Sequence, residues 1–210
     1  MIKIEIKSIF GKVIFTYEKE NATFKDAVID AIAKNADLRY ADLRYADLRS
    51  ADLSSADLSY ADLSYADLRS AHLSYADLRS ADLRYADLSY ADLSYADLSS
   101  AHLSSADLSS ADLSSADLRS ADLSSADLSY ADLSYADLRY TNLDKRYIQI
   151  ACIGSRKGMT TYCFEDDIIW CGCYKGTLDE FEFKVNKTHA NNEKYRKEYL
   201  GFIYYLRGLK

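Results

Sequence analysis

Residues 36–55 read ADLRYADLRYADLRSADLSS, four copies of a five-residue unit in which Ala, Asp and Leu precede two variable positions. The unit continues without interruption to Leu143, so that Leu recurs 22 times at every fifth position. Up to residue 140 the fourth position is always Arg or Ser and the fifth is always Tyr or Ser. The few departures from Ala-Asp-Leu are His72, His102, Thr141 and Asn142.

A period of five fits neither regular secondary structure. In an α-helix, which turns ~100° per residue, successive Leu side chains would be ~140° apart and would form no apolar stripe. In a flat strand they would alternate between the two faces. A chain that bends once per unit can point every Leu inward, with the small Ala beside it. Such bends stack in layers, so the sequence predicts a solenoid with a core of Leu and Ala.

The repeated Ala-Asp-Leu-x-x, as in Ala36–Tyr40, strongly resembles the pentapeptide-repeat proteins over 108 of the 210 residues. The resemblance implies a mainly β fold, a right-handed quadrilateral parallel β-helix with four units in each coil. Twenty-two units then give about five and a half coils and a height of ~26 Å at ~4.8 Å per coil. The ends of such a stack would expose apolar side chains and unpaired strand edges, so we expect a cap at each end.

The flanking sequences predict these caps. We expect an N-terminal α+β cap at 1–35, the β-helix at 36–143 and a C-terminal α+β cap at 144–210. Residues 2–7 and 12–18 alternate apolar and polar side chains, which predicts a β-hairpin. Thr23 and Asp26 have the spacing of a capping box before a helix, and Asn35 is a plausible helix stop.

The C-terminal segment predicts three strands followed by two helices. The strands are Tyr147–Ile153, Thr160–Glu165 and Ile168–Tyr174, one helix follows a capping box at Thr177–Glu180, and the last follows Asn191-Asn192. Gly154–Gly158 lacks the glycine spacing of a phosphate-binding loop and favours a hairpin turn. Through Gly154–Gly158 and Trp170–Cys173, the segment resembles tails that follow pentapeptide arrays in some phage and bacterial proteins.

Negative charge is concentrated in the repeats. Residues 36–140 hold 19 Asp and 8 Arg, whereas the whole chain has a net charge of −7. This balance argues against direct nucleic-acid binding through a basic surface. If the units are divided among four faces, one face has a net charge of −4 and no Arg, and the others have net charges of −2, −2 and −3. The Arg-free face contains Asp52, Asp92, Asp112 and Asp132 together with His72.

Two interpretations of the Asp lattice remain open. Asp could serve only a structural role at the outer corner of each unit and keep the solenoid soluble. Alternatively, the carboxylates could mimic the charges of DNA, as is thought of the members of this family that protect or inhibit DNA gyrase. The Tyr residues at the fifth position, including Tyr75 and Tyr95, could bind a protein partner or a sugar. They could equally pack on one another along a ladder.

The stacked carboxylates lead to a conditional prediction. Like charges ~4.8 Å apart repel by about 1 kcal/mol in water. If this repulsion dominates, folding raises the pKa values of the Asp residues and added salt stabilises the protein. If hydrogen bonds and Arg partners dominate, salt lowers the stability instead.

We find no pattern of nucleophile, base and orienting residue, and we predict a protein that is not an enzyme and has no cofactor. His72 and His102 occupy outward repeat positions, and His189 lies near the end of a predicted helix. Cys152, Cys163, Cys171 and Cys173 lack paired Cys-x-x-Cys spacing, so we expect buried thiols, with a metal site as the alternative. No apolar run approaches ~18 residues and no signal-peptide core is present, so we expect a cytoplasmic protein that does not enter a membrane.

The sequence therefore predicts a non-catalytic structural or protein-interaction solenoid with an acidic surface. The alternative is a DNA mimic that binds a type II topoisomerase such as DNA gyrase. The candidate partner-binding residues are Asp52, Asp92, Asp112, Asp132, Tyr75 and Tyr95.

Overall fold

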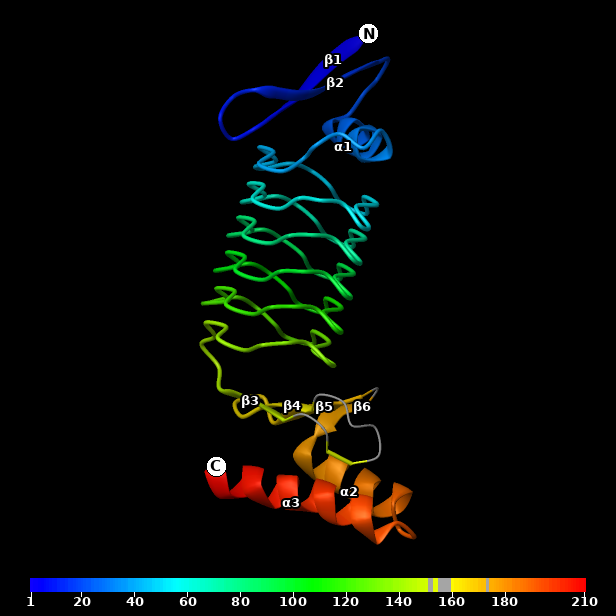
Figure 1. Cartoon of the computed structure of the whole chain (residues 1–210), viewed down its shortest axis with the longest axis vertical. Helices are drawn as coiled ribbons and strands as arrows, with labels where there is room; N and C mark the ends of the chain where they lie inside the picture. Colours follow the sequence, from blue (N-terminus) through cyan, green and yellow to red (C-terminus); the bar gives the residue numbers. More distant parts are fainter. Residues whose placement is uncertain (151–152, 155–159, 173) are drawn as a thin grey trace. The chain divides into compact units, whose positions relative to one another are not determined.

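The computed structural model describes residues 1–150, 153–154, 160–172 and 174–210 (Figure 1). Contacts group the chain into two compact units, Met1–Asp132 with Asp137–Asp144, and Leu133–Ala136 with Lys145–Lys210. The predicted boundaries between residues 35 and 36 and between residues 143 and 144 stay predictions. None of the helices in the described part of the chain has the length and apolar character that crossing a bilayer requires.

The first unit begins with the predicted hairpin and helix. Strands β1 (Ile2–Lys7) and β2 (Val13–Lys19) pair antiparallel, and helix α1 (Phe24–Ala33) follows. The Thr23 side chain accepts from the Asp26 N–H, and the Asp26 side chain accepts from the Thr23 N–H. This confirms the capping box. The helix buries Ala27, Val28 and Ala31 and leaves Phe24 and Ile32 half-buried.

Asn35 ends α1 as the sequence suggests. It adopts a left-handed conformation with φ 53°, and its N–H donates to the Ile32 carbonyl at 2.9 Å. The next N–H, of Ala36, donates to the Ala31 carbonyl at 2.9 Å. These two bonds form a Schellman motif, which satisfies the last carbonyls of the helix. The chain therefore passes directly from the helix into the first repeat unit.

The repeat segment coils with a period of twenty residues. Parallel bridges join Asp-slot residues twenty positions apart, from Asp42 with Asp62 to Asp122 with Asn142, which gives four units per coil. Figure 1 shows these coils stacked along the cyan to green part of the chain. Every repeat Leu from Leu43 to Leu123 is at most 1% exposed, which confirms the inward-facing Leu core. The handedness and the total number of coils stay predictions.

The unit Ala91–Tyr95 illustrates how the backbone N–H groups are satisfied. The N–H groups of Asp92, Leu93 and Tyr95 donate to carbonyls of neighbouring coils at 2.7–3.0 Å. The Ala91 N–H closes a turn on the carbonyl of Leu88 at 3.0 Å. The remaining N–H, of Ser94, donates to the Asp92 side chain at 3.0 Å. All five N–H groups therefore have partners, as a backbone with a buried interior requires.

Among its described residues, the second unit contains a sheet of four antiparallel strands rather than the predicted three. Its order is β3 (Tyr147–Ile150), β4 (Thr160–Cys163), β5 (Ile168–Cys171) and β6 (Tyr174–Thr177). The prediction is wrong because the chain reverses after Cys171, which pairs with Tyr174 across a tight turn containing Gly172 at φ 62°. Positions 151–152 of the first predicted strand and 155–158 of the predicted turn lie outside the described residues.

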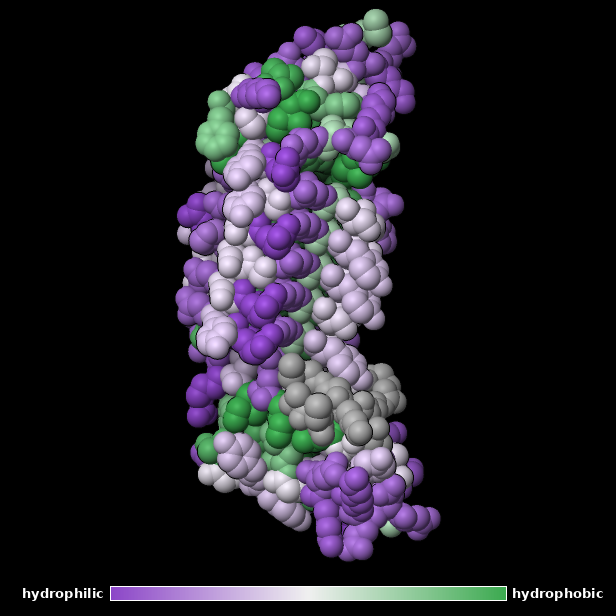
Figure 2. Space-filling model, viewed as in Figure 1, coloured by the Kyte–Doolittle hydropathy of each residue, from purple (hydrophilic) through white to green (hydrophobic). Residues whose placement is uncertain are grey.

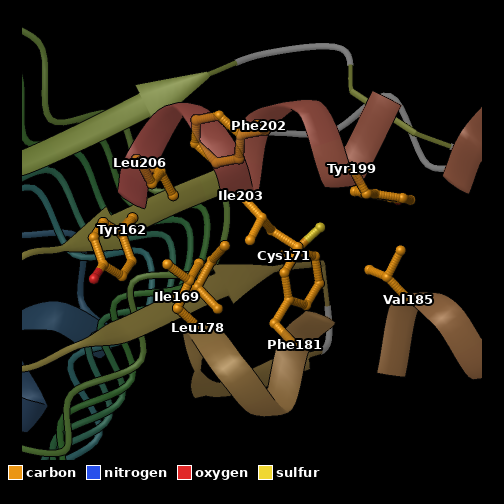
Figure 3. Close-up of a cluster of buried hydrophobic side chains, with 10 residues drawn as sticks. All are labelled: Tyr162, Ile169, Cys171, Leu178, Phe181, Val185, Tyr199, Phe202, Ile203 and Leu206. Atoms are coloured by element: carbon orange, nitrogen blue, oxygen red, sulfur yellow. The ribbon is translucent and has the colours of Figure 1, made fainter. Parts of the chain in front are cut away.

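Two helices cover one face of this sheet. Helix α2 (Leu178–Thr188) begins at the predicted capping box of Thr177 and Glu180, and α3 (Glu193–Leu209) begins after the predicted Asn192. Figure 3 shows side chains of both helices pointing toward the strands. The buried cluster consists of Tyr162, Ile169, Cys171, Leu178, Phe181, Val185, Tyr199, Phe202, Ile203 and Leu206.

Candidate interaction surface

The Asp carboxylates of the repeats are part of the local backbone structure. Oδ1 of Asp92 accepts the N–H of Ser94 at 3.0 Å and its hydroxyl at 2.6 Å. The same bond recurs where the fourth residue is Arg, as between Asp37 and Arg39 at 3.1 Å. Side chains of Asp commonly accept an N–H two residues further along in turns. One oxygen of the Asp is therefore used inside its own unit.

On three faces, Arg side chains also bind the carboxylates. Arg39 contacts Asp37 with Nε at 2.8 Å and Nη2 at 2.7 Å. Several of the Arg residues also reach an Asp of the next coil, as Arg69 reaches Asp87 at 3.5 Å. The other cross-coil pairs are Arg44–Asp62, Arg49–Asp67, Arg79–Asp97 and Arg119–Asp137. Figure 2 shows strongly hydrophilic side chains in rows along the repeat segment.

These donors lower the pKa values of the Asp residues. The hydrogen bonds from Arg39 lower the pKa of Asp37 from 3.8 to about 2, and those from Arg49 do the same for Asp47. Arg donors lower the pKa of five further Asp and Ser donors lower that of two: Asp42, Asp67, Asp77, Asp117 and Asp137, and Asp52 and Asp122. Burial acts to raise the pKa of Asp82, but the Arg84 donors outweigh it and lower that pKa as well. Repulsion between stacked carboxylates, which would raise these values, therefore does not dominate at these positions.

The fourth face differs because it has no Arg. We use the name Arg-free column for Asp52, His72, Asp92, Asp112 and Asp132, which the structure joins by successive parallel bridges. The residue two positions after each of these five is Ser. Asp52 and Asp112 are exposed, and Asp92 and Asp132 are half-buried. The structure thus brings the four Asp residues that the sequence singled out into one row, and their role in partner binding stays a prediction.

Tyr75 and Tyr95 flank this column, because each stands three residues after one of its members, His72 or Asp92. Their rings stack with centroids 4.9 Å apart and planes 3° apart. Tyr45, Tyr65 and Tyr85 form a second ladder of this kind. The packing interpretation is therefore correct for these rings. Stacking covers only the faces that two neighbouring rings share, so the ring edges and the outer faces of the end rings remain for contact with a partner.

The histidines lie where the sequence suggests. His72 and His102 are exposed in Asp slots, and His189 is the C-terminal cap of α2, with its ring stacked on Tyr199 at 5.4 Å. Neither His72 nor His102 provides the carboxylate that accepts a backbone N–H in other units. Within the described residues, the N–H groups of Ser74 and Ser104 have no hydrogen-bond acceptor.

Two of the four cysteines can be placed. Cys163 and Cys171 are both buried, at 0% and 9% exposure. Cys163 pairs with Ile168, whereas Cys171 pairs with Thr160, three residues before Cys163, so the two thiols lie on opposite faces of the sheet. Burial raises the pKa of Cys163. Cys152 and Cys173 lie outside the described residues, and among those that are described no group of three His, Cys, Asp or Glu could hold a metal ion.

A coil of four units with inward Leu and outward Asp defines a pentapeptide-repeat solenoid. The family model described as Pentapeptide repeats matches in eight copies, over residues 34–64, 61–99, 86–129 and 106–144. The chain belongs to this family. The match ends at residue 144, so the resemblance of the C-terminal segment to phage and bacterial tails stays a prediction.

Solved structures of other pentapeptide-repeat proteins resemble parts of this chain. Rfr23 from the cyanobacterium Cyanothece 51142 is 35% identical over 46% of this chain and 62% of its own, with a TM-score of 0.39. HetL from Nostoc sp. strain PCC 7120, a protein involved in heterocyst differentiation regulation, is 37% identical over 50% of this chain and 58% of its own, with a TM-score of 0.35.

QnrB1, a plasmid-mediated fluoroquinolone resistance protein, is 20% identical over 49% of this chain and 79% of its own, with a TM-score of 0.20. For Rfr23 and HetL, described above, this chain spans only about three fifths of the length of each protein. No curated protein matches the chain.

Proposed function

We propose that this chain is a non-catalytic protein-interaction solenoid and that its Arg-free column contacts a basic segment of a protein partner. The observation that carries the proposal is the distribution of Arg. Each of the other three faces has Arg residues that bind its own carboxylates, and only this face has none. Its net charge of −4 is the most negative of the four. Attraction between such a negative surface and a basic segment of a partner directs association and contributes to specificity.

The carboxylates of Asp92 and Asp112 are available for such a contact. Oδ1 of Asp92 and of Asp112 accepts the N–H of the following Ser. Oδ2 of these two residues has no hydrogen-bond partner within the described residues. Tyr75 and Tyr95, which stand three residues after His72 and Asp92, are 62% and 55% exposed. Carboxylates next to aromatic rings suit a partner rich in Lys or Arg.

The test replaces the charges without removing the backbone acceptors. Asn can occupy the Asp slot, as Asn142 does, and it keeps an oxygen for the turn. The column variant is Asp52→Asn with Asp92→Asn, Asp112→Asn and Asp132→Asn. The matched control carries the same four charge changes on other faces: Asp57→Asn, Asp87→Asn, Asp97→Asn and Asp107→Asn.

Wild type, column variant and control are each immobilised and exposed to the same cell extract at increasing salt. We expect proteins that bind the wild type and the control but not the column variant, with retention that weakens as salt rises. Identical sets of bound proteins on all three baits would contradict the proposal.

A DNA mimic that binds a type II topoisomerase is the alternative, and charge density favours it. A net charge of −11 over residues 36–140, spread along ~26 Å, is one charge per ~2.4 Å, compared with ~1.7 Å in duplex DNA. In a gyrase supercoiling assay with titrated protein, this function predicts a change in activity that the column variant weakens. Unchanged supercoiling at micromolar excess of the wild type would exclude it.

A further inference from the structure

An open pocket of about 650 Å³ lies in the first unit, between β1 and the first coil. Its lining includes Lys3, Glu5 and Lys7 from β1 and Asp42, Arg44 and Tyr45 from the coil. Alternation along β1 places its three residues on one face, opposite Ile6, which is fully buried. The pocket thus combines charged groups with an aromatic ring, and none of its lining residues belongs to the Arg-free column.

Tyr45 presents an uncovered ring to this pocket. It is the first ring of the ladder Tyr45–Tyr65–Tyr85, in which neighbouring centroids are 5.1 and 4.8 Å apart. In the adjacent ladder, Phe10 lies over the first ring, Tyr40, at 5.8 Å, and Tyr40 is only 38% exposed. Tyr45 is 71% exposed. A flat aromatic ligand could therefore extend the Tyr45 ladder by one ring, as Phe10 extends the other.

The charges beside the ring favour an anion. Nζ of Lys3 and Nζ of Lys7 contact the single carboxylate of Glu5 at 3.1 and 3.6 Å, and the two Lys side chains are 55% and 52% exposed. Each ammonium has three donors, so both retain capacity for a second acceptor. Arg44 is bound to Asp42 and to Asp62. The lining has three cations and two carboxylates, although the repeats have a net charge of −11.

We propose that this pocket binds a nucleoside monophosphate, with the base stacked on Tyr45 and the phosphate near Lys3 and Lys7. The volume lies within the range of about 300–1,000 Å³ that is usual for small-molecule sites. Lys binds phosphate as a point charge, and an aromatic ring stacks on any base. The negative field of the repeats disfavours ligands with more phosphates. The proposal does not depend on partner binding at the Arg-free column.

Calorimetric titration of the full chain at low ionic strength tests the two halves of the ligand separately. The probes are AMP, adenosine, ribose 5-phosphate and ATP. We expect AMP to bind, and adenosine and ribose 5-phosphate to bind at least about tenfold more weakly, because each lacks one of the two contacts. ATP is expected to bind no more tightly than AMP.

Two Tyr variants locate the site. Tyr45→Ser should lower the affinity for AMP about tenfold through loss of stacking. Ser occupies the same column at Ser105 and Ser125, with the same φ of 60° and 58°, so the fold accepts it. Tyr85→Ser removes a ring at the other end of the ladder and should leave AMP binding unchanged. Absence of AMP binding, ribose 5-phosphate binding as tight as AMP, or an equal loss in the two variants would overturn the proposal.

Discussion

The Asp carboxylate of a repeat unit accepts the backbone N–H two residues further along, as Asp92 does from Ser94. This bond gives Asp a structural reason to recur that is independent of any partner. At His72 and His102 the carboxylate is missing, and the N–H groups of Ser74 and Ser104 have no acceptor among the described residues. These two units are therefore weak points of the ladder.

Restoring the acceptor should stabilise the protein. We expect His72→Asn to raise the free energy of unfolding by about 0.5–1 kcal/mol, because the amide oxygen can accept the Ser74 N–H without adding charge. His72→Ala provides no acceptor and serves as the control. Urea denaturation measures both, and equal stabilities of the two variants would show that the bond contributes nothing.

The fifth position of each unit shows what the sequence did not reveal. All fifth residues from Tyr40 to Tyr140 have φ between 54° and 63°, although none is Gly. They stand third in a four-residue turn, as Tyr45 does between Arg44 and Ala46, and type II turns need a positive φ there. Because Gly or Asn is the usual sequence signal for this conformation, Tyr and Ser gave no hint of it.

A β-branched side chain at this position should be poorly tolerated. We expect Ser105→Val to lower the free energy of unfolding by about 1–2 kcal/mol, since the left-handed region disfavours it. Ser105→Asn should be neutral or stabilising, because Asn adopts positive φ readily. Thermal unfolding compares the stabilities of the two variants. If Ser105→Val were as stable as Ser105→Asn, the left-handed backbone at this position would not disfavour β-branched side chains.

Among the secondary structure elements, those with strong end signals could be predicted from the sequence. Thr23 with Asp26 and Thr177 with Glu180 mark the starts of α1 and α2, and both capping boxes form. Strand β6 was missed because Tyr174–Thr177 is short and contains Gly176, and Gly is depleted in strands. The pairing of β6 with β5, in which Cys171 lies opposite Tyr174, depends on a tight turn that the alternation of apolar and polar residues does not reveal.

Within the second unit, Gly154 packs closely against α3. It has φ 65°, its N–H donates to Glu198 at 2.9 Å, and a Cβ at this position would collide with the Tyr199 ring. We expect Gly154→Ala to cost about 2–4 kcal/mol, from backbone strain together with overpacking.

The double variant Gly154→Ala with Tyr199→Leu separates these two causes. It should lose at least about 1 kcal/mol less than the sum of the single variants, because the smaller side chain relieves the clash. Chemical denaturation of all three variants measures this coupling. Additive effects would show that Tyr199 does not restrict Gly154.

At the scale of the whole molecule, the period of five, together with the four-unit coil that the family resemblance implies, placed Asp52, Asp92, Asp112 and Asp132 in one column before the structure was known. The sequence could not show whether repulsion or pairing dominates on the acidic surface. That balance depends on distances such as 2.8 Å from Arg39 Nε to Asp37, which only the folded coil defines.

Acid should therefore destabilise the protein. Asp37 and Asp47 have pKa values of about 2 in the folded state, below the ordinary 3.8 that applies when the chain is unfolded. Their contribution to stability is fully present above 3.8 and is lost as the pH falls toward 2, because the unfolded state then binds more protons. The free energy of unfolding, measured by urea denaturation from pH 5 to pH 2, should decrease steadily, and an increase would contradict this sign.

The most direct measurement is a ¹³C NMR titration of the Asp side-chain carboxyl groups in the folded protein. The account holds that donors built into each coil keep these carboxylates charged, so Asp37 and Asp47 should titrate near pH 2. Midpoints above 3.8 at these residues would show that repulsion between stacked carboxylates prevails, and that the acidic surface is not stabilised in the way the structure indicates.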